Sequence, residues 1–180
     1  MYSVIEINQN QPYFDCWDVQ VEYQINNQLL SFNNCSFDQV FTGENISLKR
    51  AIAEKKLLRC FIDIGRERGG DFIMAGSVSL IWKPEEHCCY MGGLWIEPEF
   101  RGNGLATYIL NEITNFADEL GMVLTLHALP FISPEIKPAD EDISKLKDYY
   151  RQFGFSSNSE TMGLASCCAM ERLPGSKRNN

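Results

Sequence analysis

A glycine-containing junction carries the clearest chemical signal in the chain. It reads IEPEFRGNGLA over residues 96–106 and separates an apolar run from a long amphipathic one. Asn103-Gly104 alone would suit a hairpin turn, but helical periodicity follows, so Gly102 and Gly104 are expected at a strand-to-helix transition. The first N–H groups of a helix lack internal partners, and the helix dipole adds partial positive charge there. The junction therefore predicts a site for a phosphate or another anion.

Two common phosphate-binding motifs do not account for this junction. A nucleoside-triphosphate loop requires GxxxxGK followed by Ser or Thr, which the stretch lacks. The dinucleotide fingerprint GxGxxG is nearly present, but Thr107 replaces its third glycine. The next predicted strand also ends in His127-Ala128 rather than in the acidic residue that would bind a ribose. The first motif is excluded and the second is disfavoured.

A family resemblance rests on two segments in order. Arg101-Gly-Asn-Gly104-Leu-Ala106 resembles the R/Q-x-x-G-x-G/A signature of the GNAT N-acetyltransferase superfamily, and Tyr149-Tyr-Arg-Gln-Phe-Gly-Phe155 resembles its F/Y-Y-x-x-x-G-F segment. The resemblance is good over 57–173, whereas 1–56 match only through an expected strand and one or two helices. It implies an α/β (α+β) fold: a mixed, mostly antiparallel sheet flanked by helices, with two splayed central parallel strands that admit acetyl-CoA.

The resemblance also implies that main-chain groups bind the acetyl donor, acetyl-CoA. Leu94, Trp95 and Ile96 would present strand backbone to the pantetheine and the acetyl carbonyl. The pyrophosphate would be bound at the helix start, with Arg101 adding charge, by Gly102, Asn103, Gly104, Leu105, Ala106 and Thr107.

Acetyl transfer to an amine calls for a base and an acid. An alkylamine with a pKa near 10.4 arrives mostly protonated, and the departing thiolate needs a proton. By the resemblance, Tyr150 is the candidate acid, although it also falls on the apolar stripe of its predicted helix. His127 is a candidate base at a place where several relatives carry a catalytic Glu. Glu97 is the rival, and water alone stays an open alternative.

The composition limits the other function classes. The chain has 180 residues, 44% of them hydrophobic, and a net charge of −8 with a pI near 4.8. That charge argues against nucleic acid as a partner and suits a cationic substrate, although acidity also simply favours solubility. No signal segment and no bilayer-spanning stretch is evident, so a cytoplasmic protein without membrane association is expected. Seven cysteines without a CxxC, and only two histidines, predict no metal site.

The apolar patterns predict the elements that position these residues. Strands are expected over 19–25, 28–32, 57–64, 72–82, 90–96, 122–128 and 167–173, with turns at 26–27 and 65–71. Helices are expected over 46–56 and 105–120, the latter ended by Gly121, and another is capped by Asp140 or Asp142. One domain over 1–173, followed by a flexible tail over 174–180, is the predicted organisation.

The predicted function is therefore that of an acetyl-CoA-dependent N-acetyltransferase, in which a primary amine attacks the thioester directly within a ternary complex. The alternative is a non-catalytic acyl-CoA-binding regulatory module. The acceptor stays open among a small cationic amine, a protein N-terminus and a lysine side chain, and the protein is expected to be a monomer or homodimer. Residues 128–144 depart from the family pattern where the acceptor site is usually shaped.

Overall fold

In the computed structural model, which describes residues 18–25, 28–35, 58–68, 71–131, 138–157 and 168–176, one mixed sheet forms the centre of the fold. The strand order is β2-β1-β3-β4-β5-β6-β8-β7, and β5 with β6 is the parallel pair among otherwise antiparallel neighbours. The GNAT-like fold predicted from sequence is confirmed. The strands are β1 (Asp18–Ile25), β2 (Gln28–Cys35), β3 (Leu58–Arg68), β4 (Asp71–Lys83), β5 (Cys88–Ile96), β6 (Val123–His127), β7 (Ser156–Ser157) and β8 (Ala169–Arg172).

Strand alternation separates a core face from an outer face of the sheet. On β3 and β4, the buried side chains occupy every second position, such as Ile62 and Val78, which pair directly across the two strands. The hairpin between β3 and β4 is confirmed, but the predicted turn over 65–71 was wrong because both strands continue through most of it. A register shift at Ile64/Gly65 lets the pairing resume and extend to Arg68 and Asp71. The turn predicted at 26–27 and the helix predicted at 46–56 lie outside the described residues.

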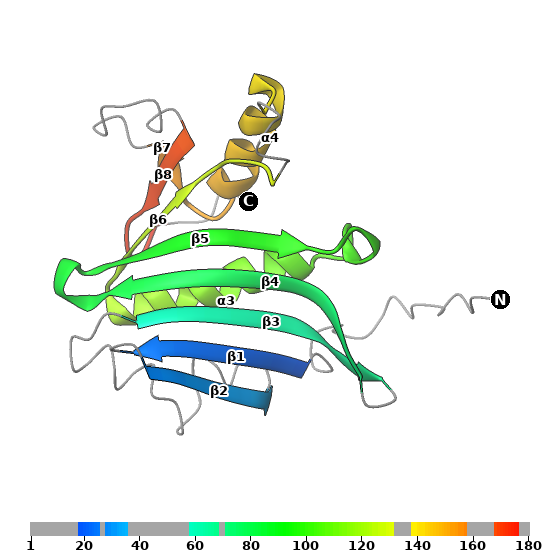
Figure 1. Ribbon diagram of the computed structural model, residues 1–180. Helices are drawn as coiled ribbons and strands as arrows, with labels where there is room; N and C mark the ends of the chain where they lie inside the picture. The colour runs from blue at the N-terminus through cyan, green and yellow to red at the C-terminus, as the bar shows by residue number, and fades with distance from the viewer. Residues whose placement is uncertain are drawn as a thin grey trace.

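Helix α3 (Leu105–Leu120) covers the core face of the sheet, behind β3, β4 and β5 in Figure 1. Its apolar stripe is buried, and the ring of Phe116 meets that of Trp82 edge to face at 5.4 Å between centroids. Gly121 ends the helix in a left-handed conformation with a φ of 64°, as predicted. The packing of α3 against the sheet therefore fixes the position of its N-terminus relative to β5.

Helix α4 (Asp140–Arg151) precedes the Gly154 turn and β7. Neither Asp140 nor Asp142 caps it, contrary to the prediction: the N-cap is Ala139, which follows Pro138 in an extended conformation. Both acids instead lie in the first turn, where negative charge interacts favourably with the helix dipole. Two short 3-10 helices, η1 (Pro84–Glu86) and η2 (Pro98–Phe100), flank β5.

The parallel strands β5 and β6 separate along their length. Their ladder pairs Cys88 to Met91 with Val123 to Leu126, and β5 then continues over 92–96 beyond that pairing. Figure 1 shows β6, β8 and β7 diverging from the line of β5. The predicted splay is thus present, and over residues 92–96 the edge of β5 that faces β6 is not paired with it.

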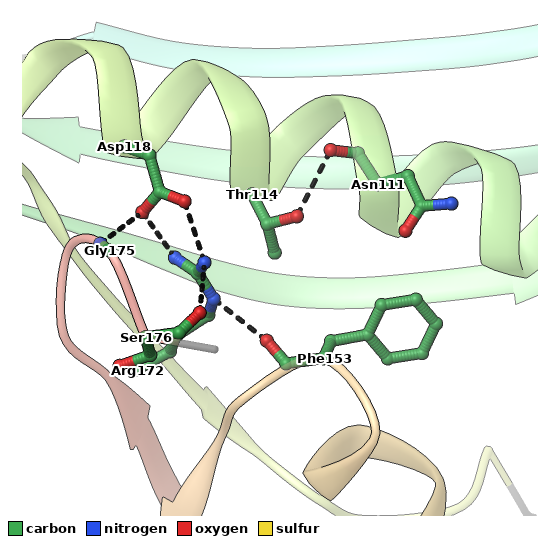
Figure 2. A network of polar contacts seen from close by, with 7 residues as sticks. All are labelled: Asn111, Thr114, Asp118, Phe153, Arg172, Gly175 and Ser176. Carbon is green, nitrogen blue, oxygen red and sulfur yellow. Dashed lines mark hydrogen bonds and ion pairs between the residues drawn. The ribbon is translucent and has the colours of Figure 1, made fainter. Parts of the chain in front are cut away.

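A polar network closes the other end of α3 (Figure 2). The guanidinium of Arg172, which is only 2% exposed, donates to both carboxylate oxygens of Asp118 at 2.6 and 2.7 Å. Its Nε donates to the carbonyl of Phe153 at 2.8 Å, and the Gly175 N–H donates to Asp118. One buried side chain therefore joins α3, β8 and the turn after α4.

No helix within the described segments is long and apolar enough to cross a bilayer.

Candidate functional site

A cavity of about 1010 Å³ lies where β5 and β6 separate. Its walls are the far half of β5, the start of α3, the end of β6 and the last turn of α4. It therefore gathers residues from both sequence motifs. Of the predicted site residues, those that line it are Leu94, Trp95, Ile96, Arg101, Gly102, Gly104, Leu105, Ala106, Thr107, His127 and Tyr150.

The start of α3 is open toward this cavity. Residues 101–104 are exposed, and the N-cap Gly104 has a φ of 78° and no capping side chain. Gly102 has a φ of 78° as well, and a Cβ placed on it would meet no atom within 4 Å. Glycine adopts a positive φ without steric cost, and the absence of side chains at both positions leaves the helix N–H groups accessible. The geometry fits an anion at the predicted junction.

Arg101 lies along the same wall, where its side chain has two contacts. Its Nε donates to the carbonyl of Ile96 at 2.9 Å, and its guanidinium carbon lies 4.8 Å from the ring centre of Trp95. These contacts order a positive charge between the end of β5 and the start of α3. The same wall thus combines main-chain donors with one cationic side chain.

Tyr150 enters the cavity from the last turn of α4. It is 8% exposed, its ring packs edge to face against Phe155, and burial, with Tyr149 adding to it, raises its pKa to about 12. Its hydroxyl therefore keeps its proton at neutral pH. Phe155 and the glycine before it belong to the second motif, which explains locally why the tyrosine is held in this position.

His127 is the last residue of β6, is exposed, and lines the same cavity. Its Nδ1 lies 3.2 Å from the Tyr90 hydroxyl, in a hydrogen bond whose donor depends on the imidazole tautomer. The two rings meet edge to face at 5.8 Å. Tyr90, which also lines the cavity, thus orients the imidazole.

Glu97 and Asn103 do not line the cavity, unlike the other predicted residues. Glu97 is half-buried, its N–H donates to the carbonyl of Ala75 and its carbonyl accepts from the N–H of Phe100. Those bonds join the end of β5 to β4 and to η2. Its main chain thus has a clear structural task, and the structure does not bring its side chain together with Tyr150 and His127.

Sequence reasoning missed several residues of this site. Tyr149 lines the cavity, and its hydroxyl lies 3.3 Å from Thr107 Oγ1 at the start of α3. Burial raises the pKa of Tyr149, although the Thr107 contact partly offsets the shift. Gly92 and Gly93 line it on β5, and a glycine pair inside a predicted strand was the signal that could have found them.

No group of three or more potential metal-binding side chains occurs among the residues that the structure describes. The buried cysteines are structural. Cys60, Cys89 and Cys168 are buried, and burial raises the pKa of the Cys89 thiol well above its usual value. A buried thiol with a raised pKa is a poor ligand and nucleophile.

Comparison with known proteins decides the family. A sequence model described as the acetyltransferase (GNAT) family matches residues 26–133, which is more than half of the chain. The chain belongs to the GNAT acetyltransferase family. The assignment supports acyl-CoA-dependent acetyl transfer in general terms, without naming an acceptor.

Solved structures of other GNAT proteins are similar at low identity, and no curated protein sequence matches. Tetrahymena GCN5 is 11% identical with a TM-score of 0.43, covering 67% of this chain and 72% of that one. Nourseothricin acetyltransferase is 15% identical with a TM-score of 0.41, covering 90% and 89%. PaiA N-acetyltransferase from Thermoplasma acidophilum, solved in complex with coenzyme A, is 16% identical with a TM-score of 0.41, covering 63% and 59%.

Proposed function

We propose that this GNAT protein is an N-acetyltransferase that moves an acetyl group from acetyl-CoA to a primary amine by direct attack within a ternary complex. One observation carries the proposal. A single cavity is lined by Tyr150, by His127, by the open start of α3 and by the part of β5 that lies beyond its ladder with β6. An acid, a basic side chain and an anion site around one space are the parts that acetyl transfer to an amine requires.

The donor fits the two main-chain walls of the cavity. The start of α3, from Gly102 to Thr107, offers N–H groups and a favourable dipole to the pyrophosphate, and the Arg101 guanidinium adds charge. Residues 94–96 of β5 lie past the β6 ladder, so their backbone on that side is available to the amide groups of the pantetheine. Asn103, next to the two glycines, would contribute its main chain only.

The reacting carbonyl is expected beside Gly92. The β4–β5 register passes from Ser79/Gly93 to Leu80/Met91, which leaves Gly92 as the extra residue of a β-bulge. A bulge disrupts the local ladder, and glycine lets another molecule approach the backbone closely. A main-chain N–H there would stabilise the negative charge that develops on the carbonyl oxygen when the amine attacks.

His127 is the proposed base. The ammonium must first lose one proton to free the lone pair that forms the bond to the carbonyl carbon, and His127 lines the cavity in which this takes place. In the tautomer whose Nδ1–H donates to the Tyr90 hydroxyl oxygen, Nε2 has the free lone pair that accepts this proton, directly or through water. Glu97 is the alternative base, and a Glu97→Gln variant with full activity would exclude it.

Tyr150 is the proposed acid. As the carbon–sulfur bond breaks, the electron pair stays on sulfur and the phenol hydroxyl donates to it. A pKa of about 12 keeps the phenol protonated, but it also makes full transfer to a thiolate, whose acid has an ordinary pKa near 8.5, uphill. Tyr150 should therefore donate a strong hydrogen bond to sulfur as the carbon–sulfur bond breaks. The second proton, which the nitrogen loses as the amide forms, then passes to the sulfur and completes the thiol.

The test follows free thiol released from acetyl-CoA across a panel of amines and peptides. We expect turnover on at least one acceptor, and Tyr150→Phe should lower kcat by about tenfold to a hundredfold with CoA affinity nearly unchanged. Tyr108→Phe, a half-buried α3 residue outside the cavity lining, is the matched control. CoA binding without turnover on any acceptor would instead support the non-catalytic regulatory module.

A further inference from the structure

A second, smaller cavity lies on the outer face of the sheet, next to the donor cavity. It has a volume of about 250 Å³, and we call it the outer groove. Its main lining side chains are Phe61, Asp63, Ser77, Ser79, Trp95 and Phe131. Phe61 and Phe131 are large apolar residues that remain 48% and 58% exposed.

Strand register explains why these side chains share one face. Asp63 pairs with Ser77, which pairs with Trp95 on β5. Phe61 pairs with Ser79, which pairs with Gly93. Paired residues point to the same side of a sheet, so two parallel rows run across three strands opposite the α3 side.

The outer groove is continuous with the donor cavity. Gly93, Trp95 and Phe131 line both, and a Cβ on Gly93 would lie 2.6 Å from Phe131 Cζ. The Phe131 ring also meets Trp95 edge to face at 5.7 Å. Phe131 thus stands at the boundary of the two cavities, beside the bare backbone where the thioester is expected to react.

The chemistry of the outer groove suits a positively charged alkyl group. Asp63 is the charged side chain among its described lining residues. The exposed ring of Phe61 can contact both a cation and methylene groups, whereas the Trp95 ring already lies against the Arg101 guanidinium. The net charge of −8 favours the approach of a cation. We propose that this groove binds the far end of the acetyl acceptor, and that the acceptor is a small diamine whose second ammonium group is held by Asp63.

The spacing sets the length of the diamine. Asp63 lies two strands across and two residues along from Gly93, which places their Cα atoms on the order of 12 Å apart. A six-carbon spacer spans most of that distance, and the Asp63 side chain covers part of the rest. The groove volume, below the roughly 300–1,000 Å³ of drug-sized sites, excludes a bulky occupant.

This inference rests on the proposed function, so its test measures binding separately from turnover. Titration calorimetry with CoA present would compare hexamethylenediamine, hexylamine and aminocaproate, which share one amine and a similar length but end in ammonium, methyl and carboxylate groups. We expect the diamine to bind about tenfold more tightly than hexylamine, and aminocaproate to bind most weakly.

Two variants locate the preference. Asp63→Asn should remove most of the tenfold advantage of the diamine and leave hexylamine affinity within about twofold, while Phe61→Ser should weaken both ligands alike. Asp71→Asn removes a carboxylate from the exposed start of β4, outside both cavities, and should change neither. Circular dichroism of each variant checks that it is folded.

The outcomes separate the two proposals. Diamine binding that depends on Asp63, without any acetyl transfer, would support the groove and count against the enzyme. Turnover with hexylamine equal to or better than that of the diamine, or an Asp63→Asn variant that affects all three ligands equally, would overturn the groove proposal while the proposed function stands.

Discussion

The two ends of helix α3 differ in how their main-chain groups are satisfied. At the start, Gly104 is an exposed N-cap without a capping side chain, and the first helical hydrogen bond runs from the Tyr108 N–H to its carbonyl. At the other end, the Gly121 N–H donates to the carbonyls of Ala117 and Asp118. The Asp118 carboxylate also accepts from the buried Arg172.

The difference teaches that glycine with a positive φ serves two purposes in one helix. Gly121, with a φ of 64°, ends the helix at a place that other groups of the protein cover. Gly102 and Gly104, each with a φ of 78°, lie where donors are left open. An unsatisfied helix start is tolerated when water or a ligand reaches it, so the open end is the part available for binding and the closed end the part that stabilises the fold.

The largest effect is expected at the closed end. Arg172→Met would leave Asp118 and the Phe153 carbonyl without their shared donor, and should lower the free energy of unfolding by about 3 kcal/mol, near the low end for a broken buried pair because the Asp118 side chain is 31% exposed. Urea denaturation measures this loss. The double variant Arg172→Met/Asp118→Asn should lose less free energy of unfolding than the sum of the losses of the two single variants. A loss below about 1 kcal/mol for Arg172→Met would mean that the closed end is not the stabilising one.

The next effect separates the two glycines directly. Gly102→Val and Gly121→Val both place a β-branched residue at positive φ with no atom within 4 Å of the new Cβ, so both should cost about 1–2 kcal/mol of stability. Only Gly102→Val should weaken CoA binding, by about thirtyfold, or roughly 2 kcal/mol. Equal CoA affinities of the two variants would show that the open end does not hold the donor.

A smaller effect tests the buried acid next to the open end. The pKa of Tyr150 is about 12 in the folded protein against an ordinary 10, so its contribution is present below pH 10 and is lost as the pH rises toward 12. The free energy of unfolding should fall by about 1.4 kcal/mol between pH 9 and pH 11 on this account. The Tyr150→Phe variant should lack this pH-dependent fall in the free energy of unfolding. If the variant and the wild type have the same pH dependence, the Tyr150 hydroxyl is exposed to water and the account of its burial is wrong.

The smallest effect concerns a side-chain hydrogen bond between the open end and α4. Tyr149 and Thr107 share a 3.3 Å hydrogen bond at a partly exposed site, worth about 0.5 kcal/mol. A double-mutant cycle with Tyr149→Phe and Thr107→Val should give that coupling energy in denaturation. A coupling as large as that of Arg172 with Asp118 would mean that the start of α3 is as firmly closed as its end.

The sequence predicted the open end better than the closed one. The glycines and the apolar stripe of α3 are local patterns, so the junction could be predicted from them, whereas the splayed strands were predicted from the family resemblance. Arg172 and Asp118 are 54 residues apart and carry no local signal. The bulge at Gly92 and the two rows of the outer groove depend on cross-strand register, which no single strand encodes. Ala139, in an extended conformation, is the N-cap in place of the predicted aspartates, and no residue type at this position gave a local signal for it.

The most direct test of the central claim is amide hydrogen exchange of the protein with and without coenzyme A. Binding at the open end should slow exchange over 92–96 and 102–107, where main-chain groups line the donor cavity. Amides over 116–122 and 169–176, at the closed end, should change little. Slowed exchange confined to the closed end, or no change over 102–107 at saturating coenzyme A, would contradict the account.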